Sequence, residues 1–173
     1  GDAVTVTATT LPNWLNLSAA TTTVSSLAFS TGLSQRNRLR RQSLRGVSAD
    51  ASGNVYVVVA SPSHKVYKIS PSGVVTTLAG STQGFVNGTG AAAQFNTPSG
   101  LTVDASGNVY VADTGNHKIR KISPSGMVTT LAGSTQGFAE GTGTAAKFDS
   151  PYGVSVDVLG NVYVTDSGNH KTR

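Results

Sequence analysis

The chain repeats itself at a fixed interval, and this repetition constrains its fold more than any single motif does. Residues 71–118 align with residues 124–171 at an offset of 53 positions, and 34 of these 48 positions are identical. An earlier copy, residues 46–73, matches residues 100–126 with one extra residue. A period near 50 residues indicates a stacked array of similar units, because one such unit cannot bury its apolar faces alone.

Each copy has the pattern of four short strands. In the middle copy the expected strands cover residues 100–104, 108–113, 117–123 and 127–133, and turns rich in Gly, Asn, Ser or Pro separate them. The stretch between copies is longer, and its AAAQFN segment is compatible with one helical turn. Four antiparallel strands per repeat are typical of a propeller blade. We therefore predict an all-β fold, a β-propeller built of four-stranded antiparallel blades.

Residues 98–123, PSGLTVDASGNVYVADTGNHKIRKIS, resemble the NHL repeat. The connector pattern LAGSTQGF followed by GTGAAAQF is similar to the long-period form of bacterial NHL-repeat proteins. The resemblance covers residues 46–173. It implies a β-propeller, usually of about six blades, that serves mostly as a binding scaffold and occasionally as the frame of an enzyme.

The repeats also predict the organisation of the chain. Residues 1–20 are expected to be an N-terminal segment, either a linker or the end of an immunoglobulin-like or cadherin-like module, which Leu11, Pro12 and Trp14 resemble. The rest is expected to be an incomplete propeller, with about two full blades plus partial blades at each end, from a larger parent chain or a homo-oligomer. The expected parts are a blade tail (21–32), a connector (33–45), a blade (46–80), a connector (81–99), a blade (100–133), a connector (134–152) and a partial blade (153–173).

Several polar residues recur with the same neighbours in each repeat, which favours a structural role in turns and hydrogen bonds between strands. They are His64, Asp113, Asn116, His117, Asp166, Asn169 and His170. The first copy departs from this pattern, because it has Ala60, Pro62 and Ser63 where the others have Asp-x-Gly-Asn. The alternative is that the three histidines converge on a metal ion, as in a zinc-dependent lyase on a related propeller.

Other motifs are expected to be structural. Asp104 and Asp157 precede hairpin turns and are expected to cap them, with calcium binding as the alternative. The Gly-Thr-Gly segments at residues 88–90 and 141–143 are read as loop turns, because no Lys-Ser or Lys-Thr follows them as in a phosphate-binding loop.

The connectors differ between repeats whose strands are nearly identical, so specificity for a ligand is expected there. The alternative is neutral drift at exposed positions. The candidate ligand-facing residues are Val86, Asn87, Gln94, Asn96 and Ser99 in one connector and Ala139, Glu140, Lys147, Asp149 and Tyr152 in the next.

The net charge of +5 has a local origin. Five of the 13 basic residues lie within ten positions, and without them 8 basic residues face 8 acidic ones. These five are Arg36, Arg38, Arg40, Arg41 and Arg45. A basic loop for RNA is one interpretation. The other is a frame slip in residues 34–46, because a suitable choice of codons read one nucleotide later gives ANGTGSAASLYG, which resembles the connector. The second interpretation predicts no nucleic-acid partner.

Taken together, these patterns predict a non-catalytic binding or surface-interaction module with a protein or glycan partner. No catalytic residue, cofactor or metal is expected, and no apolar run reaches the length of a membrane span. The absence of Cys excludes disulfides, and the low charged fraction of 12% favours an extracellular or cell-surface location. The alternatives are a propeller-framed enzyme, either a lyase or a lactone hydrolase, and a structural subunit of an extracellular assembly.

Overall fold

The computed structural model of the chain describes residues 43–173. The predictions for the N-terminal segment (1–20), the blade tail (21–32), the first four arginines of the basic cluster and most of the connector at 33–45 lie outside these residues. So does most of the region to which the frame-slip hypothesis applies.

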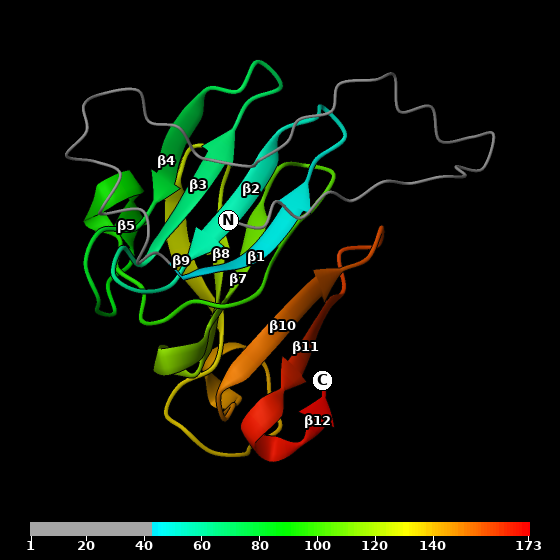
Figure 1. Cartoon of the computed structure of the whole chain (residues 1–173). Helices are drawn as coiled ribbons and strands as arrows, with labels where there is room; N and C mark the ends of the chain where they lie inside the picture. The colour runs from blue at the N-terminus through cyan, green and yellow to red at the C-terminus, as the bar shows by residue number, and fades with distance from the viewer. Residues whose placement is uncertain (1–42) are drawn as a thin grey trace, which may run out of the picture. The chain divides into compact units, whose positions relative to one another are not determined.

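The described residues form three antiparallel sheets (Figure 1). The first contains four strands in chain order: β1 (Leu44–Ala49), β2 (Val55–Val59), β3 (Lys65–Ile69) and β4 (Val75–Ala79). The second has the order β5-β9-β8-β7-β6, from β5 (Gly88–Thr89), β6 (Leu101–Val103), β7 (Val109–Asp113), β8 (Lys118–Ile122) and β9 (Met127–Ala132). The third contains β10 (Pro151–Val156), β11 (Val162–Asp166) and β12 (Lys171–Thr172).

Short 3₁₀ helices occupy the turns and connectors. They are η1 (Gly90–Ala92), η2 (Thr114–Asn116), η3 (Gly143–Ala145) and η4 (Ser167–Asn169). η1 and η3 lie in the connectors, where the sequence predicts a helical turn. η2 and η4 lie between the second and third strands of their sheets, and each ends at a histidine in the left-handed conformation.

An aspartate shapes the first hairpin turn of each repeat. Asp104 Oδ1 accepts hydrogen bonds from the backbone N–H groups of Ser106 and Asn108, and Oδ2 accepts from Asn108 Nδ2 and from the Tyr110 hydroxyl. Gly107 has φ +78°, which a glycine adopts without strain. Asp50 and Asp157 make the same set of bonds, so one local sequence produces one turn three times.

The first strands of the three sheets lie side by side, with β6 in contact with both β1 and β10. Two glycines permit this approach. An added Cβ at Gly46 would lie 2.8 Å from Ser99 O, and one at Gly100 would lie 2.5 Å from Tyr152 O. Gly100 N–H donates to Tyr152 O at 2.9 Å across the boundary between two sheets. The sheets therefore stack through their innermost strands, as propeller blades do.

Each boundary between sheets is filled by side chains of both sheets and of the connector that joins them. The core between the first and second sheets includes Val66 and Ala79, then Phe95 of the connector, then Val109 and Ile122. The core between the second and third sheets contains Ala112, Ile119, Ala146, Phe148 and Val164. Both cores of residues 43–173 therefore lie between blades, and each is shared by two of them.

The strand registers correct one detail of the sequence alignment. Val59 pairs with Lys65, as Asp113 pairs with Lys118, so the counterpart of Asp113 in the first blade is Val59 and not Ala60. The extra residue of the first copy therefore lies in the turn after β2. Both alignments leave the first blade without this aspartate.

Candidate functional site

The second blade contains a buried ion pair that the sequence pattern alone did not indicate. Asp113 and Arg120 are both 0% exposed, and Arg120 Nη1 donates to Asp113 Oδ2 at 2.8 Å. Asp113 also accepts hydrogen bonds from the backbone N–H of Asn96 and from Asn116 Nδ2. Burial raises the pKa of Asp113, and these hydrogen bonds together with the Arg120 charge oppose that rise.

The guanidinium of Arg120 holds the connector that precedes its own blade. It donates to the carbonyl oxygens of Val86 and Gln94 and to the side-chain oxygen of Asn87, at 3.1, 3.2 and 2.6 Å. Its Cζ lies 4.8 Å from the ring centre of Phe85 and 5.3 Å from that of Phe95. Both rings come from the connector, so the arginine is placed against two aromatic faces that attract a cation.

The last repeat builds the same arrangement around Arg173. This residue contacts Asp166 at 3.2 Å, donates to the carbonyl oxygens of Ala139 and Lys147, and lies 5.2 Å from the Phe138 ring and 4.8 Å from the Phe148 ring. We call an arginine with its aspartate and its two connector phenylalanines an arginine clamp. The clamp explains why the phenylalanines of the connector recur at a fixed spacing.

The first blade lacks both charges of the clamp. Val59 stands at the position of Asp113, and the register of β2 with β3 places Tyr67 at the position of Arg120. A buried charge without its partner is costly, so the loss of both together is what electrostatics predicts.

The recurring histidines connect neighbouring blades. His64 Nδ1 accepts the backbone N–H of Thr97, and His117 Nδ1 accepts that of Ser150, both at 3.1 Å. Each histidine follows the second strand of one blade, and its partner lies just before the first strand of the next. An accepting Nδ1 requires the tautomer protonated at Nε2. His170 occupies the same turn position in the last repeat.

Several candidate connector residues form side-chain hydrogen bonds within the protein, including Asn87 and Glu140, which are exposed. Asn87 and Glu140 bind the clamp arginines, Gln94 donates to Thr82, and Asn96 and Asp149 accept hydrogen bonds from Gln83 and Gln136. Ser99 is only 4% exposed, between Thr114 and Tyr152 O, so it does not face solvent. Val86 and Tyr152 are exposed, Lys147 is half-buried, and Ala139 forms a bridge with Lys147.

One repeat position brings three blades together at the start of their innermost strands. Arg45, Ser99 and Tyr152 each precede the first glycine of their blade. Arg45 Nη1 donates to the Tyr152 hydroxyl at 3.2 Å, and Ser99 Oγ donates to Tyr152 O at 2.7 Å. The result is an exposed guanidinium beside an exposed phenol ring, on the side of the sheets where the connectors lie.

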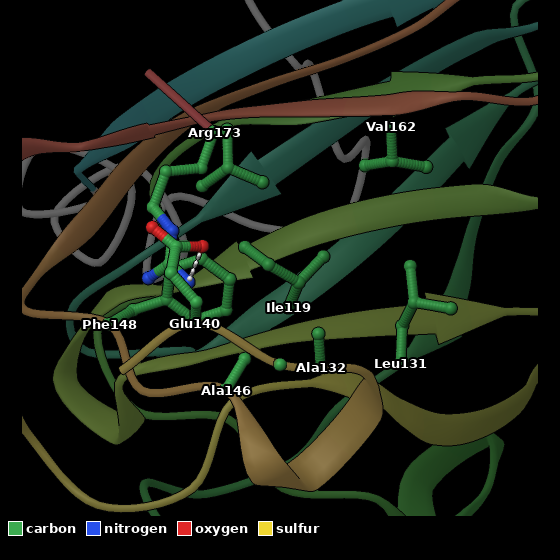
Figure 2. Close-up of a pocket in the computed structure, with 10 residues that line it drawn as sticks. Ile119, Leu131, Ala132, Glu140, Ala146, Phe148, Val162 and Arg173 are labelled. Carbon is green, nitrogen blue, oxygen red and sulfur yellow. Dashed lines mark hydrogen bonds and ion pairs between the residues drawn. The ribbon is translucent and has the colours of Figure 1, made fainter. Parts of the chain in front are cut away.

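A pocket of about 270 Å³ lies between the second and third blades. Figure 2 shows Ile119, Leu131 and Ala132 on one side, Val162 on the other, and the Glu140–Arg173 ion pair at one end. Its lining matches the filled core between the first two blades. There, Ile122 and Val128 complete the packing. The pocket therefore has the character of an inter-blade core, and its position does not require a ligand.

Within residues 43–173, no group of three or more His, Cys, Asp or Glu side chains is arranged to hold a metal ion. The same part of the chain contains no helix long and apolar enough to cross a membrane.

The NHL repeat family model matches residues 95–122 and 148–171, which contain the connector end, the hairpin aspartate and the histidine turn of two blades. This chain contains NHL repeats. Among curated relatives, NHL repeat-containing protein 3 of Mus musculus is 37% identical over 81 residues, 45% of this chain and 22% of that protein. NHL repeat-containing protein 2 of Homo sapiens is 37% identical over 95 residues, 52% of this chain and 13% of that protein.

The NHL repeats of this chain form β-propeller blades. An auxiliary nutrient binding protein from Bacteroides thetaiotaomicron superposes with a TM-score of 0.63 at 23% identity, over 73% of this chain and 35% of that one. The chain thus spans less than a quarter of the curated relatives named above and about a third of this structure.

Proposed function

We propose that the chain is a non-catalytic binding module whose ligand-contacting surface lies on the connector side of the blades, around Tyr152 and Arg45. The observation that carries this proposal is their pairing. Tyr152 is 48% exposed, and its hydroxyl accepts a hydrogen bond from the exposed Arg45.

The repeat itself supports the choice of this position. Asn87 and Glu140 differ between the connectors and are exposed, but each accepts a hydrogen bond from its clamp arginine. The position shared by Arg45, Ser99 and Tyr152 differs in size and charge in every blade. The side chains of Arg45 and Tyr152 reach solvent. The packing of the blades therefore does not explain why these two residues differ.

The chemistry of the pair favours a polar ligand. A phenol ring stacks on the apolar face of a sugar or on a peptide group, and a guanidinium donates hydrogen bonds to hydroxyl, carbonyl or carboxylate oxygens. We therefore propose a glycan or a polar protein segment as the ligand, and an extracellular or cell-surface location. Proteins of this fold include auxiliary nutrient binding proteins, so binding is a role that the fold supports.

The polar groups that a catalytic role would need are engaged in the fold. His64 and His117 each use Nδ1 to accept a backbone N–H, and the buried Asp113 is paired with Arg120. These contacts favour binding over catalysis at the recurring motif.

The test is a screen of the full chain on glycan and peptide arrays, followed by calorimetry with the ligands found. Tyr152→Ser introduces the residue that the middle repeat carries, and we expect it to weaken binding about tenfold or more. Arg45→Ser is expected to act in the same direction. Val74→Ser, at an exposed position in the turn between β3 and β4, is the matched control. A ligand bound equally well by the wild type and by both connector-side variants would refute this location.

A further inference from the structure

The first hairpin turn of the last repeat differs from its two counterparts at two adjacent positions. Residues 51–52 and 105–106 are both Ala-Ser, whereas residues 158–159 are Val-Leu. Val158 is 100% exposed and Leu159 is 84% exposed, more than any other large hydrophobic residue in the described part of the chain.

The turn itself does not need these two apolar side chains. Asp157 Oδ1 accepts hydrogen bonds from the backbone N–H groups of Leu159 and Asn161, as Asp104 does from Ser106 and Asn108. Gly160 has φ +86° and Gly107 has φ +78°. Because the position of Leu159 contributes only its backbone, serine builds the same turn in the other two blades.

A hollow of about 390 Å³ lies between this turn and the corresponding turn of the second blade. Its lining consists of two short segments, residues 103–106 and 156–160. Val103, Val156, Val158 and Leu159 give it apolar walls. The space is suited to one or two side chains of a partner, with Val158 and Leu159 adding contact area beside it.

The only charges in the lining are two carboxylates, those of Asp104 and Asp157, and none of the lining residues is basic. Their hydrogen-bond donors are neutral amide and phenol groups. Hydrogen bonds, first that of Asn161, hold the pKa of Asp157 below its usual value, so the carboxylate is ionised at neutral pH. The hollow therefore combines apolar walls with two carboxylates that form no salt bridge within residues 43–173.

We propose that this hollow docks a segment of another protein in which an apolar side chain lies next to a lysine or arginine. The apolar side chain lies between the two turns against Leu159 and Val158, and the cation approaches Asp104 and Asp157. This surface is separate from the one around Tyr152, because Tyr152 lies at the start of β10 and Val158 and Leu159 follow the end of that strand.

The test uses the full chain and fluorescein-labelled octapeptides, read by fluorescence anisotropy. The probe is Gly-Ser-Leu-Lys-Leu-Lys-Ser-Gly, and two matched peptides carry Glu in place of Lys or Ser in place of Leu. We expect the probe to bind about tenfold or more tightly than either matched peptide. The variant Val158→Ala/Leu159→Ser, which restores the residues of the other repeats, should lose at least as much affinity. Tyr152→Ser should leave it unchanged.

Two further measurements keep the proposal falsifiable. Affinity of the wild type for the probe should fall as NaCl rises, because the cation contact is exposed to screening, and this result needs no variant. The proposal would be overturned if the Lys and Glu peptides bound equally well, or if the double variant bound the probe as tightly as the wild type. So would self-association of the wild type in sedimentation experiments that the double variant abolishes, because the occupant would then be a second copy of this chain.

Discussion

Asp113 and Arg120 lie seven positions apart in the sequence and 2.8 Å apart in space, and neither side chain reaches solvent. Between them they tie three segments of the chain together: the end of β7, the middle of β8, and the connector that precedes both. The stability of the second blade is therefore expected to depend on this pair as a unit.

Asp113→Ala should lower the free energy of unfolding by about 3–5 kcal/mol, because Arg120 would remain buried without its counter-charge. The double variant Asp113→Val/Arg120→Tyr introduces the residues that the first blade carries at these positions, and it should recover part of that loss. Urea unfolding followed by circular dichroism measures both. If the losses of stability of the single variants Asp113→Val and Arg120→Tyr simply added up to that of the double variant, the pair would not be a unit.

His64 should make stability depend on pH below neutrality. Burial lowers the pKa of His64 from its ordinary value of 6.5, so the unfolded chain binds the proton first as the pH falls. The contribution of neutral His64 to the free energy of unfolding is therefore fully present above pH 6.5. It is lost as the pH falls below 6.5 and through the lower pKa of the folded state.

His64→Asn is the variant that isolates this effect. Its side-chain oxygen can accept the Thr97 N–H, and asparagine tolerates the left-handed conformation that His64 adopts at φ +50°. Thermal unfolding of both proteins between pH 5 and pH 8 measures the difference. Parallel pH profiles for the two proteins would mean that His64 titrates alike in the folded and unfolded states.

Gly100→Ala should destabilise the stack of innermost strands by about 1–3 kcal/mol or more, because the new methyl group would meet the backbone of the third blade. Gly153→Ala is the matched control at the same repeat position. There the nearest atoms belong to the Thr165 side chain, which can rotate away at the cost of the hydrogen bond from Gly153 N–H, so we expect a smaller loss. Chemical denaturation of both variants gives the comparison, and an equal loss of stability in the two would contradict the close-approach argument.

Asp104→Ala should cost about 1–3 kcal/mol at neutral pH, because the backbone N–H groups of Ser106 and Asn108 lose their acceptor. Although burial alone would raise the pKa of Asp104, the hydrogen bonds from Asn108, Tyr110 and Ser106 lower it overall from 3.8. The stabilisation is therefore present above pH 3.8 and lost as the pH falls through the folded-state pKa. Urea titrations at pH 7 and at pH 2.5 should show the difference between wild type and variant shrinking at the lower pH.

The blade pattern was readable from the sequence because each strand is short and each turn has its own residues. Asp-x-x-Gly-Asn followed by Val-Tyr-Val specifies a hairpin through local hydrogen bonds. The all-β fold and its four-stranded blades are confirmed. The sequence alignment matched Ala60, not Val59, to Asp113. An alignment anchored on His64 puts the extra residue before the end of β2, which causes this error. Only the pairing of Val59 with Lys65 reveals the register.

The sequence did not predict that Arg120 is buried, and the reason is different. Within HKIRKIS it has the appearance of an exposed strand residue between two isoleucines, and its burial depends on a connector that folds back over β8 from more than 25 positions away. Ser99 is similar, because its burial depends on contacts with Thr114 and the third blade. One signal was available: the first copy replaces both Asp113 and Arg120 by uncharged residues, and such paired losses indicate contact.

The arginine clamp also has a consequence for how such an array can grow. All of its parts lie between Phe85 and Arg120, so a duplicated gene segment that begins ahead of the connector carries a complete clamp into its new place. A segment cut at the start of β6 would separate the arginine from both of its aromatic partners. Recombination or protein engineering that adds a blade should therefore join segments near Gly80, which keeps each clamp whole. The histidine contact, the approach of the innermost strands and the inter-blade core must then form with the neighbouring copy.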